Sequence, residues 1–232
     1  MNEKESGATR IVLVRHGQTA WNREVRFRGQ ADPALDGLGL QQAQATADYV
    51  ARRWPVQAVY ASPMSRAMQT AEAVAEAHDL VAQPFEGLLD IDFGAWQGHS
   101  PTEVKREYPD LLKDWYEIPH TVQIPGGESL DIVRERVVAG LSTVVDRHRG
   151  QTVGMVGHTV VNRVLLCSIL DLGNEHFWRL RQGTCAVNVF DVDQEGTATL
   201  VVFNDTSHLQ HVGEQGSAVV VKGPGEGQLT GP

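Results

Sequence analysis

Three short runs rich in β-branched, apolar residues constrain the fold of this chain more than any other feature. They cover residues 10–14, 56–60 and 152–156, and each is long enough for a buried strand and too short for a helix. Helical stretches lie between them, one after Asp36 as N-cap and one within residues 129–148. Strands that alternate with helices predict βαβ units, and hence a mostly parallel sheet covered on both faces.

The two helices are predicted from apolar side chains at 3.6-residue spacing, which should face the core. The first set is Leu40, Ala43, Ala47, Val50 and Trp54, and the second is Val133, Val137, Leu141 and Val144. Two further strand candidates, 186–192 and 198–203, flank Gln194-Glu195-Gly196 and are predicted to form a hairpin.

Residues 99–127 interrupt this alternation. Ser100-Pro101-Thr102-Glu103 is a capping box with proline at the first helical position, and it predicts a helix to about Tyr116. Prolines and glycines between 119 and 127 then break the chain. We interpret this insertion as a lid over a site, and a surface excursion without a role is the alternative. The predicted organisation is one domain over residues 1–212 and a glycine-rich flexible tail over 213–232.

Composition and charge exclude several classes of function. The 232 residues include 20 Lys and Arg against 29 Asp and Glu, and the net charge of −9 argues against general nucleic-acid binding. No apolar run approaches ~18 residues, so no membrane span is expected. The polar start, from Met1 to Gly7, does not resemble a signal peptide. Two cysteines suggest neither a disulfide framework nor a metal site, which favours a cytoplasmic protein.

Four segments place reactive side chains at predicted strand ends or in an apolar stretch. Arg15 and His16 follow the first strand, and Arg66 lies in Ser62-Pro63-Met64-Ser65-Arg66-Ala67-Met68-Gln69-Thr70 after the second. His158 follows the strand that ends at Val156, and residues 88–98 carry Asp90 and Asp92. Each residue alone could be structural or solvated. Because the carboxyl ends of parallel strands meet at one edge of the sheet, we expect the arginines and histidines to converge there.

Phosphoryl transfer suits this set of residue types. Arg15 and Arg66 can form bidentate hydrogen bonds to phosphate oxygens and spread the charge of the transition state. A neutral imidazole can act as the nucleophile, and a nearby carboxyl group can protonate the leaving alkoxide.

The ordered motifs resemble those of the histidine phosphatase superfamily, the phosphoglycerate mutase-like proteins, from about Arg10 to Leu209. The resemblance implies a three-layer α/β/α sandwich and a two-step reaction through phosphohistidine, without a metal or other cofactor. It assigns the nucleophile to His16, the general acid and base to Asp90, and the phosphate pocket to Arg15, Arg66 and His158.

The same resemblance implies additional contacts with the substrate. Asn22, in Thr19-Ala20-Trp21-Asn22, matches a phosphate-contacting position, and Arg28, Gly29 and Thr159 are further candidates. Asp90 stands where many family members have glutamate, which shortens the proton donor by one methylene. Gln97 replaces a glutamate that supports the site, and Glu128 and Arg136 are candidates for supporting or lid-anchoring groups.

Two alternative functions are weighed against a phosphatase of small phosphorylated metabolites. Mutases that depend on 2,3-bisphosphoglycerate carry Trp-Arg-Arg after the lid helix, where this chain has Trp115-Tyr116-Glu117. We expect Glu117 to repel a substrate carboxylate there, which disfavours a mutase. A non-catalytic binding module is disfavoured because the nucleophile and both arginines are present. The expected partner is a small phosphorylated substrate, with neither nucleic acid nor membrane, and a homodimer is left open.

Overall fold

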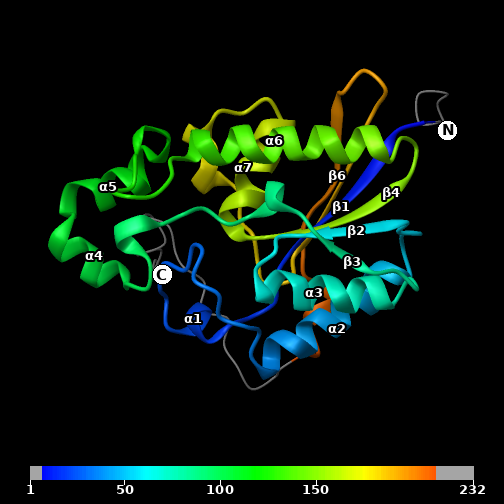
Figure 1. Ribbon diagram of the computed structural model, residues 1–232, viewed down its shortest axis with the longest axis horizontal. Coiled ribbons are helices and arrows are strands. Elements are labelled where there is room, and N and C mark those ends of the chain that lie inside the picture. Colours follow the sequence, from blue (N-terminus) through cyan, green and yellow to red (C-terminus); the bar gives the residue numbers. More distant parts are fainter. Residues whose placement is uncertain (1–6, 213–232) are drawn as a thin grey trace, which may run out of the picture.

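A six-stranded sheet with helices on both faces organises residues 7–212, the part of the chain that the computed structural model describes (Figure 1). The strand order is β3-β2-β4-β1-β5-β6, with parallel pairing from β3 to β1 and antiparallel pairing in β1–β5 and β5–β6. The strands are β1 Thr9–Arg15, β2 Ala58–Ala61, β3 Ala82–Pro84, β4 Thr152–Gly157, β5 Val187–Val192 and β6 Ala198–Asp205. The predicted α/β/α sandwich and the C-terminal hairpin are confirmed.

Within residues 7–212, seven α-helices and several short 3₁₀ helices connect the strands. The α-helices are α1 Ala20–Arg23, α2 Gly37–Ala51, α3 Ser65–Glu76, α4 Pro101–Glu107, α5 Pro109–Glu117, α6 Leu130–Arg147 and α7 Thr159–Ile169. The 3₁₀ helices used below are η2 Glu86–Leu88, η3 Gly94–Trp96, η4 Pro119–Thr121, η5 Asn174–Arg179 and η6 Ser207–Leu209. No helix among the described residues is long and apolar enough to cross a bilayer. The tail predicted to be flexible, residues 213–232, lies outside the described residues.

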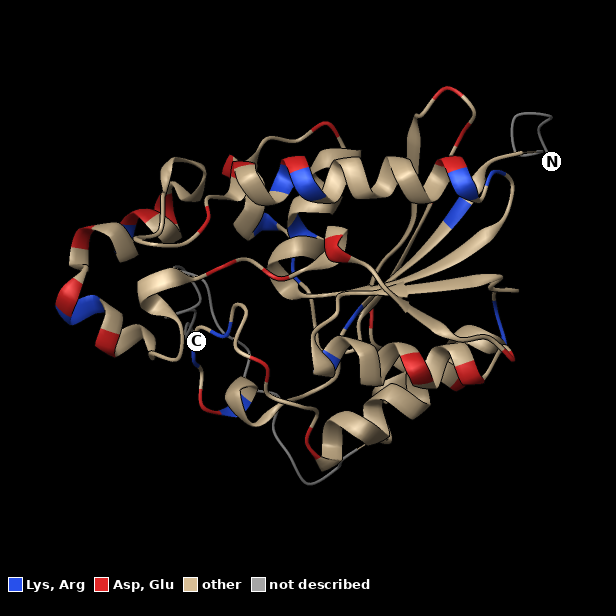
Figure 2. Cartoon of the chain, in the orientation of Figure 1, with Lys and Arg blue, Asp and Glu red and all other residues tan. Residues whose placement is uncertain are grey.

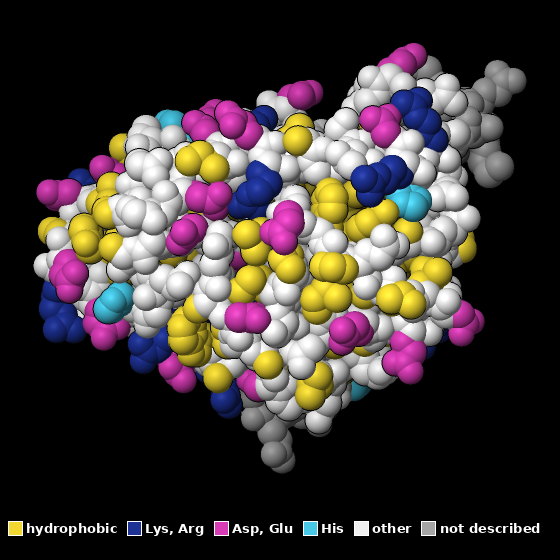
Figure 3. All heavy atoms as spheres, viewed as in Figure 1, with side chains coloured by type: hydrophobic (Ala, Val, Ile, Leu, Met, Phe, Trp, Pro, Cys, Tyr) yellow, Lys and Arg dark blue, Asp and Glu magenta, His cyan; other side chains and the backbone are white. Residues whose placement is uncertain are grey.

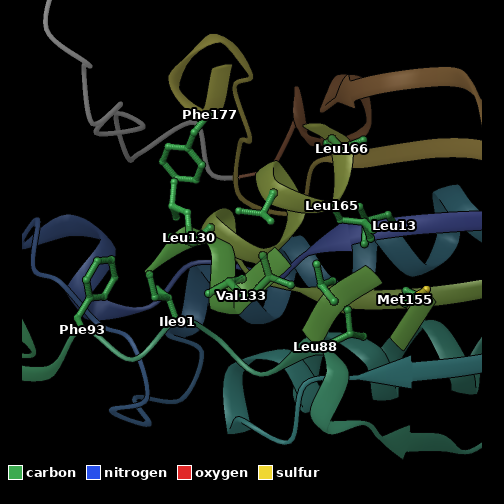
Figure 4. Close-up of a cluster of buried hydrophobic side chains, with 14 of the residues drawn as sticks. Leu13, Leu88, Ile91, Phe93, Leu130, Val133, Met155, Leu165, Leu166 and Phe177 are labelled. Atoms are coloured by element: carbon green, nitrogen blue, oxygen red, sulfur yellow. The ribbon is translucent and has the colours of Figure 1, made fainter. Parts of the chain in front are cut away.

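The two helical layers follow from the alternation of side chains along the strands. In β1, Ile11 and Leu13 join the core under α6 and α7, whereas Val12 and Val14 join the core under α2 and α3. Successive side chains of a strand point to opposite faces, so an uninterrupted apolar run buries both faces of the sheet. Figure 4 shows the first of these cores, where Leu13, Met155 and Leu165 pack together.

The insertion is built differently from its prediction. The capping box forms, because Ser100 accepts from the Glu103 amide and the Glu103 carboxylate accepts from Ser100. The single helix predicted to Tyr116 is wrong, since α4 ends at Glu107 and α5 begins at Pro109. Pro109 has no amide hydrogen and forces the preceding residue out of the helical region, and Tyr108 accordingly has φ −132° and ψ 57°.

The predicted apolar face of α2 is wrong at one position. Leu40 is 51% exposed, although Ala43, Ala47 and Val50 are buried. The buried stripe of α2 also contains Gly39 and Gln42, which an apolar pattern does not reveal, and it leaves Leu40 at its margin.

The N-terminus of α2 packs against the backbone that follows β1. Asp36 caps the helix by accepting from the Gly39 amide at 2.9 Å, and Gln42 accepts from the Gln18 amide at 2.9 Å. A Cβ at Gly39 would lie 2.1 Å from the carbonyl oxygen of Gln18, which leaves space for glycine alone. The helix therefore holds the loop of His16 through a close backbone contact.

We predict that Gly39→Ala destabilises the protein by about 1–3 kcal/mol, because the new methyl group overpacks against backbone that cannot turn aside. Gly37→Ala is the matched control in the same helix, since no atom lies within 4 Å of its added Cβ. It should be neutral or stabilising by about 0.5–1 kcal/mol, the helix preference of alanine over glycine. Denaturant unfolding of both variants measures the difference, and equal free energies of unfolding would contradict the close contact.

Candidate active site

The carboxyl ends of β1, β2 and β4 bring the predicted reactive residues to one edge of the sheet. Arg15 ends β1 and His16 follows it, Arg66 lies in the first turn of α3 after β2, and His158 is the N-cap of α7 after β4. Asp90 comes from the segment between η2 and η3. All five are at most 8% exposed. The convergence predicted from the four motifs is therefore present.

Asp90 joins the second arginine to the second histidine. Its Oδ2 accepts a hydrogen bond from Nη2 of Arg66 at 3.0 Å and lies 3.4 Å from Nδ1 of His158. Its Oδ1 accepts from the Ile91 amide at 3.0 Å. Burial raises the pKa of Asp90 and outweighs the opposing effect of Arg66 and Arg28. The carboxyl group can thus carry a proton more readily than an exposed aspartate.

His16 is oriented by the backbone next to it. Its Nδ1 lies 2.6 Å from the carbonyl oxygen of Gly17, so Nδ1 carries the hydrogen and donates it. That tautomer leaves Nε2 with a lone pair. Burial first, and then the neighbouring Arg66 charge, lower the pKa of His16 well below 6.5. The His158 ring lies 5.2 Å away between centroids, and burial lowers its pKa in the same way.

Several buried side-chain nitrogen and oxygen atoms in this cluster have no hydrogen-bond partner among the described residues. They are Nε of Arg15, Arg28 and Arg66, both ring nitrogens of His158, and the hydroxyl of Thr159. Burial lowers the pKa of Arg15 to about 9 and that of Arg28 to about 10. Unpaired buried donors next to mutually repelling cations form a binding site for an anion.

A cavity of about 800 Å³ gives access to this cluster. Six arginines and one acidic residue, Asp90, contribute to the described lining; the arginines are Arg15, Arg23, Arg26, Arg28, Arg163 and Arg181. His16, Arg66 and His158 lie deeper, each at most 1% exposed. Acidic residues gather instead on α4 and α5 (Figure 2), and the face in Figure 3 mixes charges of both signs. The chain is acidic overall and basic in its cavity.

The additional residues predicted to contact the substrate also lie at the cavity. Asn22, Gly29 and Thr159 all line it. The Asn22 amide oxygen accepts from the backbone and hydroxyl of Thr19, which leaves its N–H groups for a ligand. Gly29 has φ +52°, and its carbonyl accepts from Arg66 at 2.8 Å. Its carbonyl therefore positions Arg66.

Two further residues hold the Asp90 segment in place. Nη2 of Arg136 lies 3.0 Å from Oε2 of Glu128, and Nη1 of Arg136 donates to the carbonyl of Leu89. Glu128 in turn accepts from the Asp92 amide at 2.9 Å. These hydrogen bonds bracket Asp90 on both sides. The structure gives Glu128 and Arg136 supporting contacts, as the sequence suggested.

The structure corrects one prediction and adds residues that sequence reasoning missed. Tyr116 lines the cavity, but Glu117 is exposed and lies 3.8 Å from Lys113, so its expected repulsion of a substrate is wrong. Arg163 and Arg181 were missed. Arg163 follows Thr159 by four residues on α7 and so shares its face, which was a readable signal. Among the described residues no group of three metal-ligating side chains is found.

The comparisons with known proteins agree with one another. A family model described as "Histidine phosphatase superfamily (branch 1)" matches residues 11–206. "Phosphoserine phosphatase 1" from Hydrogenobacter thermophilus is 35% identical over 200 residues, which are 86% of this chain and 94% of that protein. "Metal-independent phosphoserine phosphatase" from Arabidopsis thaliana is 31% identical and covers 90% of this chain and 87% of its own length. The solved structure "Bacillus stearothermophilus YhfR" has a TM-score of 0.83 at 31% identity, covering 88% of this chain and 100% of that chain.

We predict that His16 stays neutral at pH 6.5 and keeps its hydrogen on Nδ1. Its lowered pKa means that the folded protein does not take up a proton there until the pH falls well below 6.5. Two-bond ¹⁵N–¹H correlation spectra of the labelled protein, with the His16 signals assigned by their loss in His16→Gln, report the tautomer. An imidazolium pattern, or hydrogen on Nε2, would contradict the assignment.

The same lowered pKa values predict a loss of stability on acidification. The unfolded chain protonates His16 and His158 as the pH falls below about 6.5, whereas the folded chain does not, so the contribution of these residues to folding declines there. In His158→Asn the fall in the free energy of unfolding between pH 7 and pH 5.5 should be smaller. An unchanged fall would argue against the buried neutral state of His158.

Proposed function

The chain belongs to branch 1 of the histidine phosphatase superfamily, and we propose that His16 is its phosphorylated nucleophile. It is a phosphohydrolase that acts on small phosphorylated metabolites, as its similarity to phosphoserine phosphatases indicates. The observation that carries the proposal is the combination of a neutral His16, with Nδ1 held by the Gly17 carbonyl, and buried arginine donors beside it.

In the first step Nε2 of His16 attacks phosphorus and forms an N–P bond while the P–O bond to the alcohol breaks. Arg15 and Arg66 bind the equatorial oxygens, and their charge stabilises the transition state. The leaving alkoxide takes a proton from the carboxyl group of Asp90. The raised pKa of Asp90 favours the protonated acid that this step requires.

In the second step the Asp90 carboxylate removes a proton from water, and the water oxygen attacks the phosphorus of phosphohistidine. The N–P bond breaks, inorganic phosphate leaves, and His16 returns to its neutral form. No metal takes part in either step, because the arginines supply the positive charge and Asp90 transfers the proton.

The two alternatives from the sequence are less well supported. The lid tripeptide Trp115-Tyr116-Glu117 lacks the two arginines that mutases of this family carry at these positions. A binding module would not need Asp90 within reach of both Arg66 and His158. Residues 99–127 act as the lid in this proposal, since Trp115 and Tyr116 of α5 line the cavity.

A cytoplasmic location is part of the same proposal. Cys167 and Cys185 are both free and buried, and burial raises the pKa of Cys185 to about 12. Thiols in that state suit a reducing compartment.

We predict that a rapid denaturing quench during turnover of ³²P-labelled substrate traps label on His16. The label should be acid-labile and base-stable, and it should form equally in EDTA. His16→Ala should carry none, whereas His120→Ala, which changes an exposed histidine of η4, should carry the wild-type amount. Label that persists in His16→Ala would refute the nucleophile, and label that needs added Mg²⁺ would refute metal independence.

We predict that Asp90→Asn separates the two steps by leaving group. p-Nitrophenolate leaves without protonation, so the first step survives, but the amide cannot deprotonate water and the second step slows by about 10²–10⁴-fold. Stopped-flow absorbance should show a stoichiometric burst of nitrophenol followed by slow turnover, and alkyl phosphates should show no burst. Small, equal losses on both substrates would remove Asp90 from this role, with Asp92 as the next candidate.

A further inference from the structure

Arg163 lies at the cavity without a counter-ion among residues 7–212. It lines the cavity from α7, and no hydrogen bond or ion pair joins its guanidinium to another described residue. Two other arginines of the cavity lining differ in this respect, because Arg26 is paired with Glu24 at 2.8 Å and Arg23 lies 3.7 Å from Asp36. Burial lowers the pKa of Arg163 to about 10, Cys167 opposes this shift, and the charge of Arg181, which also lines the cavity, contributes to it.

Aromatic rings hold this guanidinium in place. Its central carbon lies 5.2 Å from the ring centre of Phe177 and 5.0 Å from that of Trp178. Trp178 is fixed in turn, since its Nε1 donates to the carbonyl of Trp115 at 2.6 Å. Ring stacking orients an arginine and leaves its N–H edge for another group. Arg163 is thus a positioned cation whose N–H groups donate to no residue in the described part of the chain.

The position of Arg163 relates it to the phosphate end of the cavity. It follows Thr159 by four residues on α7, about 6 Å along the helix axis. Side chains of a helix lean toward its N-terminus, so Arg163 leans toward Thr159 and His158. Its charge also acts on Arg15, whose pKa it helps to lower. Arg15 and Arg163 line the same cavity of about 800 Å³, so one small molecule in it can contact both guanidinium groups.

We propose that Arg163 binds a carboxylate of the substrate, and that the enzyme prefers small phosphomonoesters that carry a carboxylate close to the ester. The planar guanidinium matches a carboxylate with two parallel hydrogen bonds. Arg15, Arg28 and Arg66 remain for the ester phosphate. This inference rests on the proposed phosphatase function and goes beyond it, because it assigns a specificity residue outside the catalytic set.

The test compares two substrates that differ only in the carboxylate, O-phosphoserine and O-phosphoethanolamine. The wild type should prefer phosphoserine in kcat/KM. In Arg163→Met, which keeps an apolar stem against Phe177 and Trp178, kcat/KM for phosphoserine should fall about 10- to 100-fold, the value of a charged hydrogen bond. Phosphoethanolamine and p-nitrophenyl phosphate should change less than about threefold. Arg163→Lys keeps the charge but lacks the planar guanidinium. Its kcat/KM for phosphoserine should lie between the values of the wild type and of Arg163→Met.

Arg134→Met is the matched control. Arg134 lies on α6, donates to the carbonyl of Leu172 at 2.9 Å and does not line the cavity, so its loss should leave the preference unchanged. Equal losses of kcat/KM for phosphoserine and phosphoethanolamine in Arg163→Met would mean that Arg163 serves only in packing, and would overturn the proposal. A wild type that does not prefer phosphoserine would overturn it as well. Absence of p-nitrophenyl phosphate hydrolysis in the wild type would instead refute the phosphatase function itself.

Discussion

The burial of one guanidinium group organises the site. Arg66 is fully buried, and its two Nη groups donate to the carbonyls of Gly29 and Ala31, both at 2.8 Å, and to the Asp90 carboxylate at 3.0 Å, which leaves its Nε without a partner among the described residues. An isolated buried charge is so costly that these partners must be in place in the folded protein. Two segments that are distant from α3 in the sequence, the loop after α1 and the Asp90 segment, therefore meet at α3 and take their positions from this requirement.

The site concentrates positive charge inside an acidic protein. Arg15, Arg28 and Arg66 repel one another, and Asp90 compensates only part of their charge. The folded protein tolerates this arrangement because the large apolar cores on both faces of the sheet hold the strand ends in place. A dianionic phosphate relieves the repulsion. Burial is the main reason why the pKa of His16 is lowered, and the same cations that would bind the phosphate lower it further.

The sequence predicted those features of the fold and of the site that depend on residues close together in the chain. Apolar runs located β1, β2 and β4, and the motifs at their ends located the reactive residues. β3 escaped notice because Ala82-Gln83-Pro84 has three residues and no apolar pattern. The orientation of Glu117 and the place of Arg163 depend on how α5 and η5 pack around Trp115 and Trp178, which no spacing in the chain encodes.

The cavity has two walls of different origin. One wall carries the reactive residues, which lie at the ends of strands of the central sheet. The other wall includes Trp115 and Tyr116 of α5, which belong to the insertion between the sheet elements. A change at Tyr116 can alter the shape of the far wall while Arg66 and Asp90 keep their partners. Substrate preference can thus diverge during evolution through substitutions in α5, while the residues that bind and transfer the phosphoryl group stay the same. One scaffold can in this way give rise to many enzymes that break the same bond in different molecules.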